Sequence, residues 1–168
     1  MNSIELAALI DSARFECRVR ELAFFVPAGA EERTHRIAAS LERLPAGRYA
    51  VGLGPNCSQT IRVGRHPVRL GRHASPLEEP RDEVVDYTVD DASLHGPREV
   101  SRVHCTLDPT DCGDDEMAVI DEGSTTGTWI QPIGSKLVPR MRTLLRHGSM
   151  FSLGPSGTNL FIVLRVGG

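Results

Sequence analysis

The sequence predicts a mainly β protein, an antiparallel β-sandwich or barrel that carries a short helical extension at its N-terminus. After Gly47, about ten short runs of β-favouring residues recur between Gly, Pro, Asn and Asp, with no convincing helical periodicity among them. Before Gly47, apolar residues recur at helical spacing instead. The chain has 168 residues, of which 40% are apolar and 24% charged. This length and composition fit one compact domain, residues 48–168, with an extension over residues 1–47.

The extension is predicted to contain two helices. Ser3 can cap a first helix, whose apolar face runs from Ile4 to Ala13. A second helix fits Glu31 to Leu44, because acidic residues occupy its start, an arginine lies near its end and a Pro-Ala-Gly sequence follows it. Between the two helices, the apolar run from Leu22 to Val26 fits either a helix end or a buried strand.

The β domain is predicted from short runs that alternate with turn-forming residues. The runs are Arg48–Gly52, Gln59–Val63, Val68–Leu70, Val85–Val89, Val103–Leu107, Met117–Asp121, Thr128–Ile130, Arg142–Leu145, Met150–Leu153 and Leu160–Val166. Their spacing breaks once, near residues 75–97, where seven of the 22 acidic residues and three prolines gather. We expect an acidic surface loop there that carries one short strand.

Several features favour a cytoplasmic protein. The first 13 residues lack a basic leader and contain Glu5 and Asp11, so no secretory signal is expected. Uncharged apolar runs such as Leu160 to Leu164 are far shorter than the roughly 20 residues that span a bilayer, so we expect no membrane insertion. The four cysteines show no C-x-x-C spacing and are expected to be free thiols. Lys136 is the only lysine beside many arginines, which suggests a GC-rich, bacterial coding sequence.

No enzyme is indicated. The sequence contains no G-x-S-x-G elbow, no phosphate loop of the G-x-x-x-x-G-K-[ST] type and no H-E-x-x-H zinc motif. Ser101, His104 and Asp121 include the residue types of a hydrolase triad, but strands rather than a strand-turn-helix surround Ser101. We expect no catalytic residue, cofactor or metal. The few aromatic residues and the net charge of −3 also argue against a nucleic-acid surface.

Three segments between predicted strands carry phosphate-binding chemistry: Leu70-Gly-Arg72, Val100-Ser-Arg-Val-His104 and Asp121-Glu-Gly-Ser-Thr-Thr-Gly-Thr128. Glycine before Arg72 permits an unusual backbone bend that would free the guanidinium to face outward. Hydroxyl and amide groups gather in the other two segments. A planar guanidinium, hydroxyls and backbone amides together supply the hydrogen-bond donors that bind a phosphate dianion.

These segments, in this order and separation, resemble the forkhead-associated (FHA) domain family. The family pattern is Gly-Arg, then Ser-x-x-His, then Asp-x-x-Ser-Thr-Asn-Gly-Thr, then a Leu-x-x-Gly-Asp-x-x-x-Leu-Gly element. The last element matches Leu145 to Gly154, and the resemblance covers roughly residues 48–166. It implies an eleven-stranded β-sandwich whose loops at one end bind phosphothreonine peptides, with a small pocket for the threonine methyl that disfavours phosphoserine.

The resemblance also implies roles for individual residues. Arg72 would hold the phosphate, Ser101 would donate its hydroxyl, and Thr125 matches the threonine that also reaches the phosphate. The full set predicted to bind the phosphopeptide is Arg72, Ser101, Arg102, Thr125 and Thr126. The set predicted to support the binding loops is Gly71, His104 and Gly127.

Three features depart from the family pattern. Thr126 stands where the family has an asparagine whose amide holds the ligand backbone, and a hydroxyl replaces only part of that donor and acceptor pair. Ser149 replaces the common aspartate of the last element and is expected to affect a turn. Residues 48–73 carry five arginines and no acid, whereas residues 74–99 carry eight acids and two arginines. The acidic loop either competes with phosphate or selects basic residues in the ligand.

Arg62, Arg65 and Arg69 are interpreted as the cover of one sheet face.

Two functions remain open from the sequence. The first is a non-catalytic adaptor in Ser/Thr kinase signalling that binds a kinase or its substrate through phosphothreonine. The second is a phosphate-independent assembly subunit, for example of a bacterial secretion system, that uses the fold as a scaffold. In that case residues 1–47 would mediate self-association or partner docking.

Overall fold

The computed structural model describes residues 30–54, 59–73, 84–89, 98–131 and 133–167. Within these ranges the chain forms one helix, α3 (Ala30–Arg43), and eleven strands. The first predicted helix, the apolar run at residues 22–26 and most of the predicted acidic loop lie outside the described residues. The second predicted helix is confirmed with its bounds shifted by one residue.

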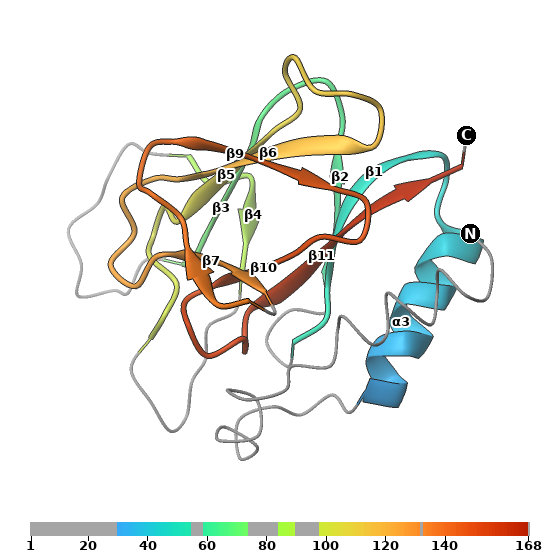
Figure 1. Ribbon diagram of the computed structural model, residues 1–168, viewed down its shortest axis with the longest axis horizontal. Coiled ribbons are helices and arrows are strands. Elements are labelled where there is room, and N and C mark those ends of the chain that lie inside the picture. The colour runs from blue at the N-terminus through green and yellow to red at the C-terminus, as the bar shows by residue number, and fades with distance from the viewer. Residues whose placement is uncertain (1–29, 55–58, 74–83, 90–97, 132, 168) are drawn as a thin grey trace.

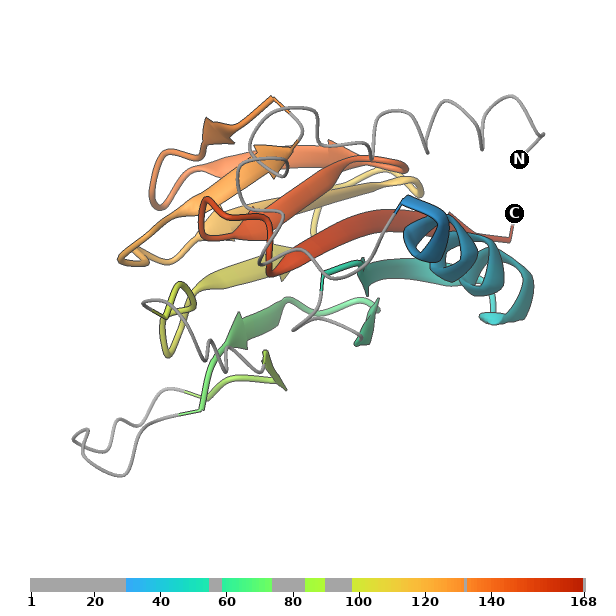
Figure 2. The same cartoon turned by 90° about the horizontal axis from the view of Figure 1, so that it is seen from below.

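Two sheets form a β-sandwich (Figures 1 and 2), which confirms the predicted fold class. The six-stranded sheet has the order β2 (Thr60–Val63), β1 (Gly47–Gly52), β11 (Leu160–Val166), β10 (Met150–Leu153), β7 (Thr128–Gln131) and β8 (Ser135–Lys136). The five-stranded sheet has the order β4 (Tyr87–Thr88), β3 (Val68–Gly71), β5 (Cys105–Asp108), β6 (Glu116–Asp121) and β9 (Arg142–Arg146). All of these neighbours are antiparallel except β3 and β4, which are parallel.

The core between the sheets follows from the two-residue period of the strands. In β2, Ile61 and Val63 are buried, whereas Thr60 and Arg62 are exposed. Phe151 and Phe161 are fully buried there and stack with ring centroids 5.3 Å apart. The same core includes Leu70, Leu107, Met117, Val119, Leu153 and Val163.

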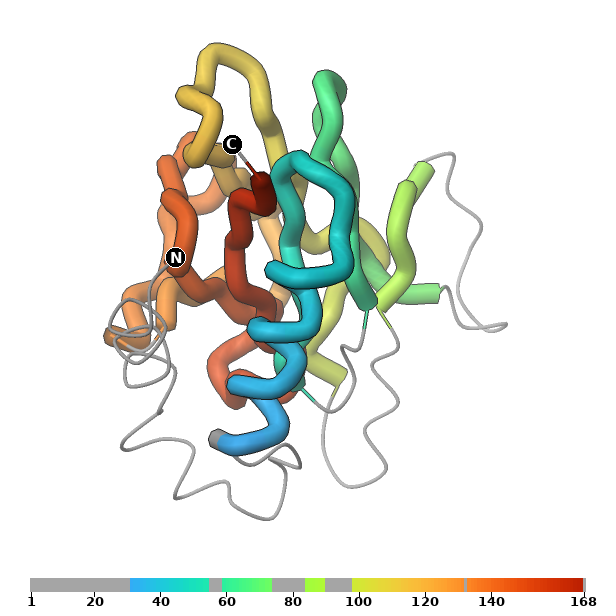
Figure 3. Tube along the Cα trace, turned by 90° about the vertical axis from the view of Figure 1, so that its right-hand side faces the viewer, coloured from blue at the N-terminus to red at the C-terminus, as the bar shows by residue number. Residues whose placement is uncertain are grey.

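Helix α3 covers the outer face of the six-stranded sheet (Figures 1 and 3). Ile37 is fully buried in a second apolar cluster, with Leu41 and Leu44 packed against it. The sheet contributes residues of β1, β10 and β11 to this cluster: Tyr49, Val51, Met150, Leu160, Ile162, Leu164 and Val166. Strand β11 is therefore buried on both faces over most of its length. The helix is part of the packed structure, and its apolar face is already occupied.

No helix among the described residues is both long and apolar enough to cross a membrane.

Candidate functional site

Antiparallel pairing brings the three predicted phosphate-binding segments to one end of the five-stranded sheet. Leu70 of β3 lies opposite Cys105 of β5, and Cys105 lies opposite Asp121 of β6. Because the direction reverses at each strand, the residues after β3, before β5 and after β6 all emerge at the same end. The segments are separated by tens of residues in sequence but become neighbours in space.

Gly71 ends β3 at a point where two loops touch. A Cβ atom built on Gly71 would lie 1.9 Å from the carbonyl oxygen of Arg102, far inside any permitted contact. The φ angle of Gly71 lies outside the left-handed region, so the predicted reason for the glycine, an unusual bend, is wrong. Glycine is required here because the backbone before β5 approaches its Cα atom closely.

Backbone hydrogen bonds hold Arg72 against the loop that precedes β5. The N–H of Arg72 donates to the carbonyl of Ser101 at 3.1 Å, and the N–H of His104 donates to the carbonyl of Leu70 at 2.8 Å. The half-buried guanidinium of Arg72 donates through Nη1 to the carbonyl of His73 at 2.9 Å. This pairing fixes the starting point of the Arg72 side chain relative to Ser101.

The Ser101 hydroxyl links the second segment to the third. Its Oγ accepts a hydrogen bond from the backbone N–H of Thr125 at 3.1 Å. An oxygen that accepts in this way still has its own proton to donate, and no described residue accepts that proton. Thr125 is exposed beside it. The structure thus brings Arg72, Ser101 and Thr125 together.

His104 joins all three segments from behind. It is fully buried, and its Nδ1 accepts the backbone N–H of Ser101 at 3.1 Å. Its Nε2 lies 3.1 Å from the carbonyl of Gly127. Because an amide N–H can only donate and a carbonyl can only accept, the ring is the neutral tautomer with its proton on Nε2. Both ring nitrogens are thereby engaged, so neither can act as a base toward the Ser101 hydroxyl.

Asp121 organises the third segment and was missed as a supporting residue by the sequence analysis. Its Oδ1 accepts the N–H groups of Gly123 and Ser124, each at 2.9 Å, and its Oδ2 accepts the hydroxyls of Ser124 and Thr128, each at 2.7 Å. Burial opposes the charged form, but the hydrogen bonds from Ser124 and Thr128 outweigh it and lower the pKa of Asp121 below 3.8. The spacing of an aspartate and a serine three residues apart after a strand could have indicated this turn.

Gly127 completes the turn that follows. Its φ angle is +88°, in the region that favours glycine, and its N–H donates to the Ser124 hydroxyl at 3.0 Å. Its carbonyl accepts the N–H of Gly154 at 2.9 Å as well as the contact from His104. Gly127 therefore links this end of the five-stranded sheet to the six-stranded sheet.

The two remaining predicted residues lie beside the cluster. Arg102 is half-buried and supplies the carbonyl that faces Gly71. The hydroxyl of Thr126 donates to the carbonyl of Glu99 at 2.6 Å, and its carbonyl accepts the indole N–H of Trp129 at 3.0 Å. The hydroxyl proton of Thr126 is therefore used within the loops.

The chain belongs to the forkhead-associated (FHA) domain family. A sequence model of the FHA domain matches residues 61–154, which is more than half of the chain. The structure of the FHA domain of the CT664 protein from Chlamydia trachomatis is similar, with 19% identity, coverage of 71% of this chain and 98% of that chain, and a TM-score of 0.51. An FHA domain of an Arabidopsis thaliana hypothetical protein matches with 19% identity, coverage of 73% and 88%, and a TM-score of 0.51.

Full-length yeast Pml1p matches with 16% identity, coverage of 81% of this chain and 92% of that chain, and a TM-score of 0.55. At these identities the solved structures share the fold with this chain. A comparison with curated proteins gave no match.

Proposed function

We propose that this protein is a phosphothreonine-peptide-binding module that acts as a non-catalytic adaptor in Ser/Thr kinase signalling. The observation that carries the proposal is the joining of Arg72, Ser101 and Thr125 at one end of the sandwich. Arg72 is hydrogen-bonded to Ser101 through the backbone, and the Ser101 hydroxyl is hydrogen-bonded to the N–H of Thr125.

The chemistry of this cluster suits a phosphate dianion. The Arg72 guanidinium offers a planar pair of donors, which matches two phosphate oxygens. The hydroxyls of Ser101 and Thr125 add donors from the neighbouring loops. Charge-assisted bonds of this kind contribute roughly 1.5–3 kcal/mol each, so loss of Arg72 should dominate the loss of affinity.

The surrounding residues support the cluster without needing to touch the ligand. His104, Asp121 and Gly127 together make hydrogen bonds to every segment that carries a proposed phosphate contact, including the backbone bond from His104 to Leu70. Donors that are fixed before the ligand arrives lose little entropy when it binds. A site of this kind can bind its ligand without a catalytic group. We therefore propose that the protein recognises phosphorylated threonine in its partners.

The experiment that tests this function is a titration of the full chain with degenerate phosphothreonine, phosphoserine and unphosphorylated peptide libraries. We expect binding to the phosphothreonine library alone, weakened at least tenfold in Arg72→Ala. Arg69→Ala is the matched control, because Arg69 is exposed on the same strand two residues before Gly71. Equal peptide affinity in folded Arg72→Ala and Arg69→Ala would refute the assignment of Arg72 to the site. Absence of binding to all three libraries would refute the proposed function.

A second candidate is a phosphate-independent assembly subunit, and the Thr126 hydroxyl favours it. Its proton goes to the carbonyl of Glu99, so the side chain at the position that holds the ligand backbone in the family pattern offers only an acceptor here. Docking through α3 is disfavoured because its apolar face packs on the sheet. A partner-docking role would then fall to residues 1–29. Removal of those residues should abolish partner recovery if the scaffold function holds and leave phosphopeptide binding intact if the adaptor function holds.

A further inference from the structure

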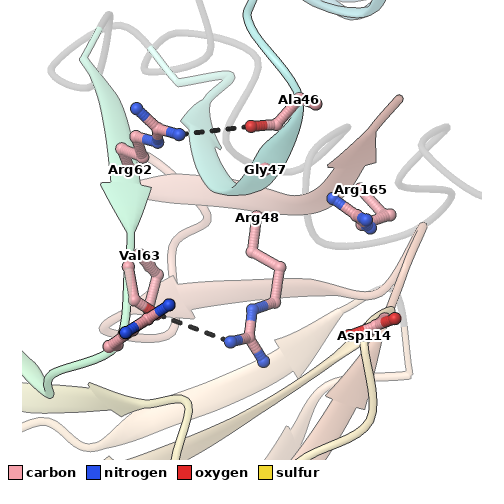
Figure 4. A pocket seen from close by; sticks show the side chains of 9 residues that line it. Ala46, Gly47, Arg48, Arg62, Val63, Asp114 and Arg165 are labelled. Atoms are coloured by element: carbon pink, nitrogen blue, oxygen red, sulfur yellow. Dashed lines mark hydrogen bonds between the residues drawn. The ribbon is translucent and has the colours of Figure 1, made fainter. Parts of the chain in front are cut away.

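Four arginines surround a pocket of about 480 Å³ that is separate from the phosphate-binding loops (Figure 4). The charged side chains that line it are Arg48, Arg62, Arg65, Arg165 and Asp114. From the sequence, Arg62, Arg65 and Arg69 are interpreted as the cover of one sheet face. Two of them, Arg62 and Arg65, are among the described residues that line this pocket.

Strand direction places this pocket at the other end of the sandwich. Gly47 and Arg48 begin β1, Val63 ends β2, and Asp114 lies in the turn between β5 and β6. The phosphate-binding loops start where β5 begins and β6 ends. The pocket and the loops are therefore separated by the length of the strands, and a ligand in one does not fill the other.

Main-chain carbonyls position three of the four guanidinium groups. Arg48 donates to the carbonyl of Glu116 at 3.1 Å, Arg62 donates to the carbonyl of Ala46 at 3.2 Å, and Arg165 donates to the carbonyl of Val166 at 3.4 Å. The Arg62 contact is drawn in Figure 4. A carbonyl oxygen orients a guanidinium but does not cancel its charge.

The positive charge of the pocket is not neutralised from within. Among the described residues, none of the four arginines forms an ion pair with a carboxylate, although other arginines of the chain do. Among the described residues that line the pocket, Asp114 is the single acid, and it pairs with none of the four arginines. Four like charges that line one opening repel each other, so a bound polyanion would relieve the repulsion.

We propose that this pocket is a second anion-binding site, which takes a compact ligand carrying an oligophosphate group. Its volume lies within the range of small-ligand sites, but its lining is charged where such sites are mostly apolar. Guanidinium groups match phosphate oxygens in pairs, and several arginines can share two or three linked phosphates. The part of the lining that the structure describes contains no aromatic residue, so it offers a nucleotide base no stacking surface.

The test is a calorimetric titration of pyrophosphate and triphosphate into the full chain with Arg72→Ala, a substitution expected to weaken the first site at least tenfold. Arg62→Gln/Arg65→Gln is the pocket variant, because both side chains are exposed and their loss should leave the fold intact. Arg43→Gln/Arg69→Gln is the matched control, since it removes the same charge at exposed positions outside the pocket. Circular dichroism checks the fold of each variant.

We expect one binding event in the Arg72→Ala chain, weakened at least tenfold in the pocket variant and within about twofold in the control. Affinity should fall with added salt. ATP should bind within about twofold of triphosphate, since the pocket offers nothing to the base. Absence of binding, or equal weakening in the pocket variant and the control, would overturn the site, and a strong preference for ATP would overturn the oligophosphate assignment. The outcome is independent of phosphopeptide binding, which is measured separately in the chain that retains Arg72.

Discussion

Substitution of Gly71 by alanine tests the close approach of the loop that follows β3 to the loop that precedes β5. The added Cβ would lie 1.9 Å from the carbonyl oxygen of Arg102. Carbon and carbonyl oxygen settle at roughly 3.3 Å or more, so the loops would have to separate by about 1.4 Å. That movement breaks the bond from the N–H of Arg72 to Ser101 and strains the bond from the N–H of His104 to Leu70.

The expected cost follows from those two bonds. Each contributes about 0.5–1.5 kcal/mol, and a buried group left without its partner costs about 1–3 kcal/mol. We expect Gly71→Ala to lower the free energy of unfolding by about 2–4 kcal/mol. Phosphopeptide affinity should fall at least tenfold, because Arg72 and Ser101 would no longer face the same phosphate.

Denaturant unfolding followed by the fluorescence of the single tryptophan, Trp129, measures the first effect, and peptide titration measures the second. Gly64→Ala is the matched control: a Cβ at Gly64 meets no atom within 4 Å, and its φ angle lies outside the left-handed region. We expect the control to stay within about 0.5 kcal/mol of the original chain. Equal stability and affinity in Gly71→Ala and Gly64→Ala would refute the close-approach argument.

Three further results are expected. Because the pKa of Asp121 is lowered in the folded protein, its contribution to stability is present above pH 3.8 and is lost as the pH falls through the folded pKa. The urea midpoint should therefore drop on acidification in the original chain and drop less in Asp121→Asn. The same dependence of the urea midpoint on pH in both chains would contradict this. Ile37→Ala should lower the free energy of unfolding by about 2–4 kcal/mol, because the Ile37 side chain of α3 is fully buried against the sheet. Exposed Glu42→Ala should be near neutral, and a neutral Ile37→Ala would mean that the helix is not part of the core. Thr126→Asn should tighten phosphopeptide binding about 3–10-fold by adding an amide donor, and weaker binding would count against that role.

Most of the fold was predictable because it rests on local patterns. Alternating burial in strands such as Thr60–Val63 leaves a period of two in the sequence, and the predicted runs match ten of the strands in place. Strand β8 was missed because Ser135 and Lys136 are both exposed and carry no apolar signal. The second helix was predictable from its acidic start and its stop after Arg43. Its packing on the outer face of the sheet was not, because that contact joins segments far apart in sequence.

The candidate site was predictable in its composition but not in its geometry. Motif spacing identified the residues that the structure brings together, including Arg72, Ser101 and Thr125. It could not predict that Gly71 is needed for close approach, because only the position of the Arg102 carbonyl reveals this. The arginine pocket could not be predicted from the sequence either, because Arg48 and Arg165 become neighbours only through the pairing of β1 with β11.

The most direct test of the proposed function is a map of backbone amide shifts in a ¹H–¹⁵N spectrum during titration with the tightest phosphothreonine peptide. We expect the largest shifts at Arg72, Ser101 and Thr125, no such shifts with the unphosphorylated peptide, and little change at α3. Shifts confined to other surfaces, or the same shifts without the phosphate, would contradict a phosphothreonine reader at this site.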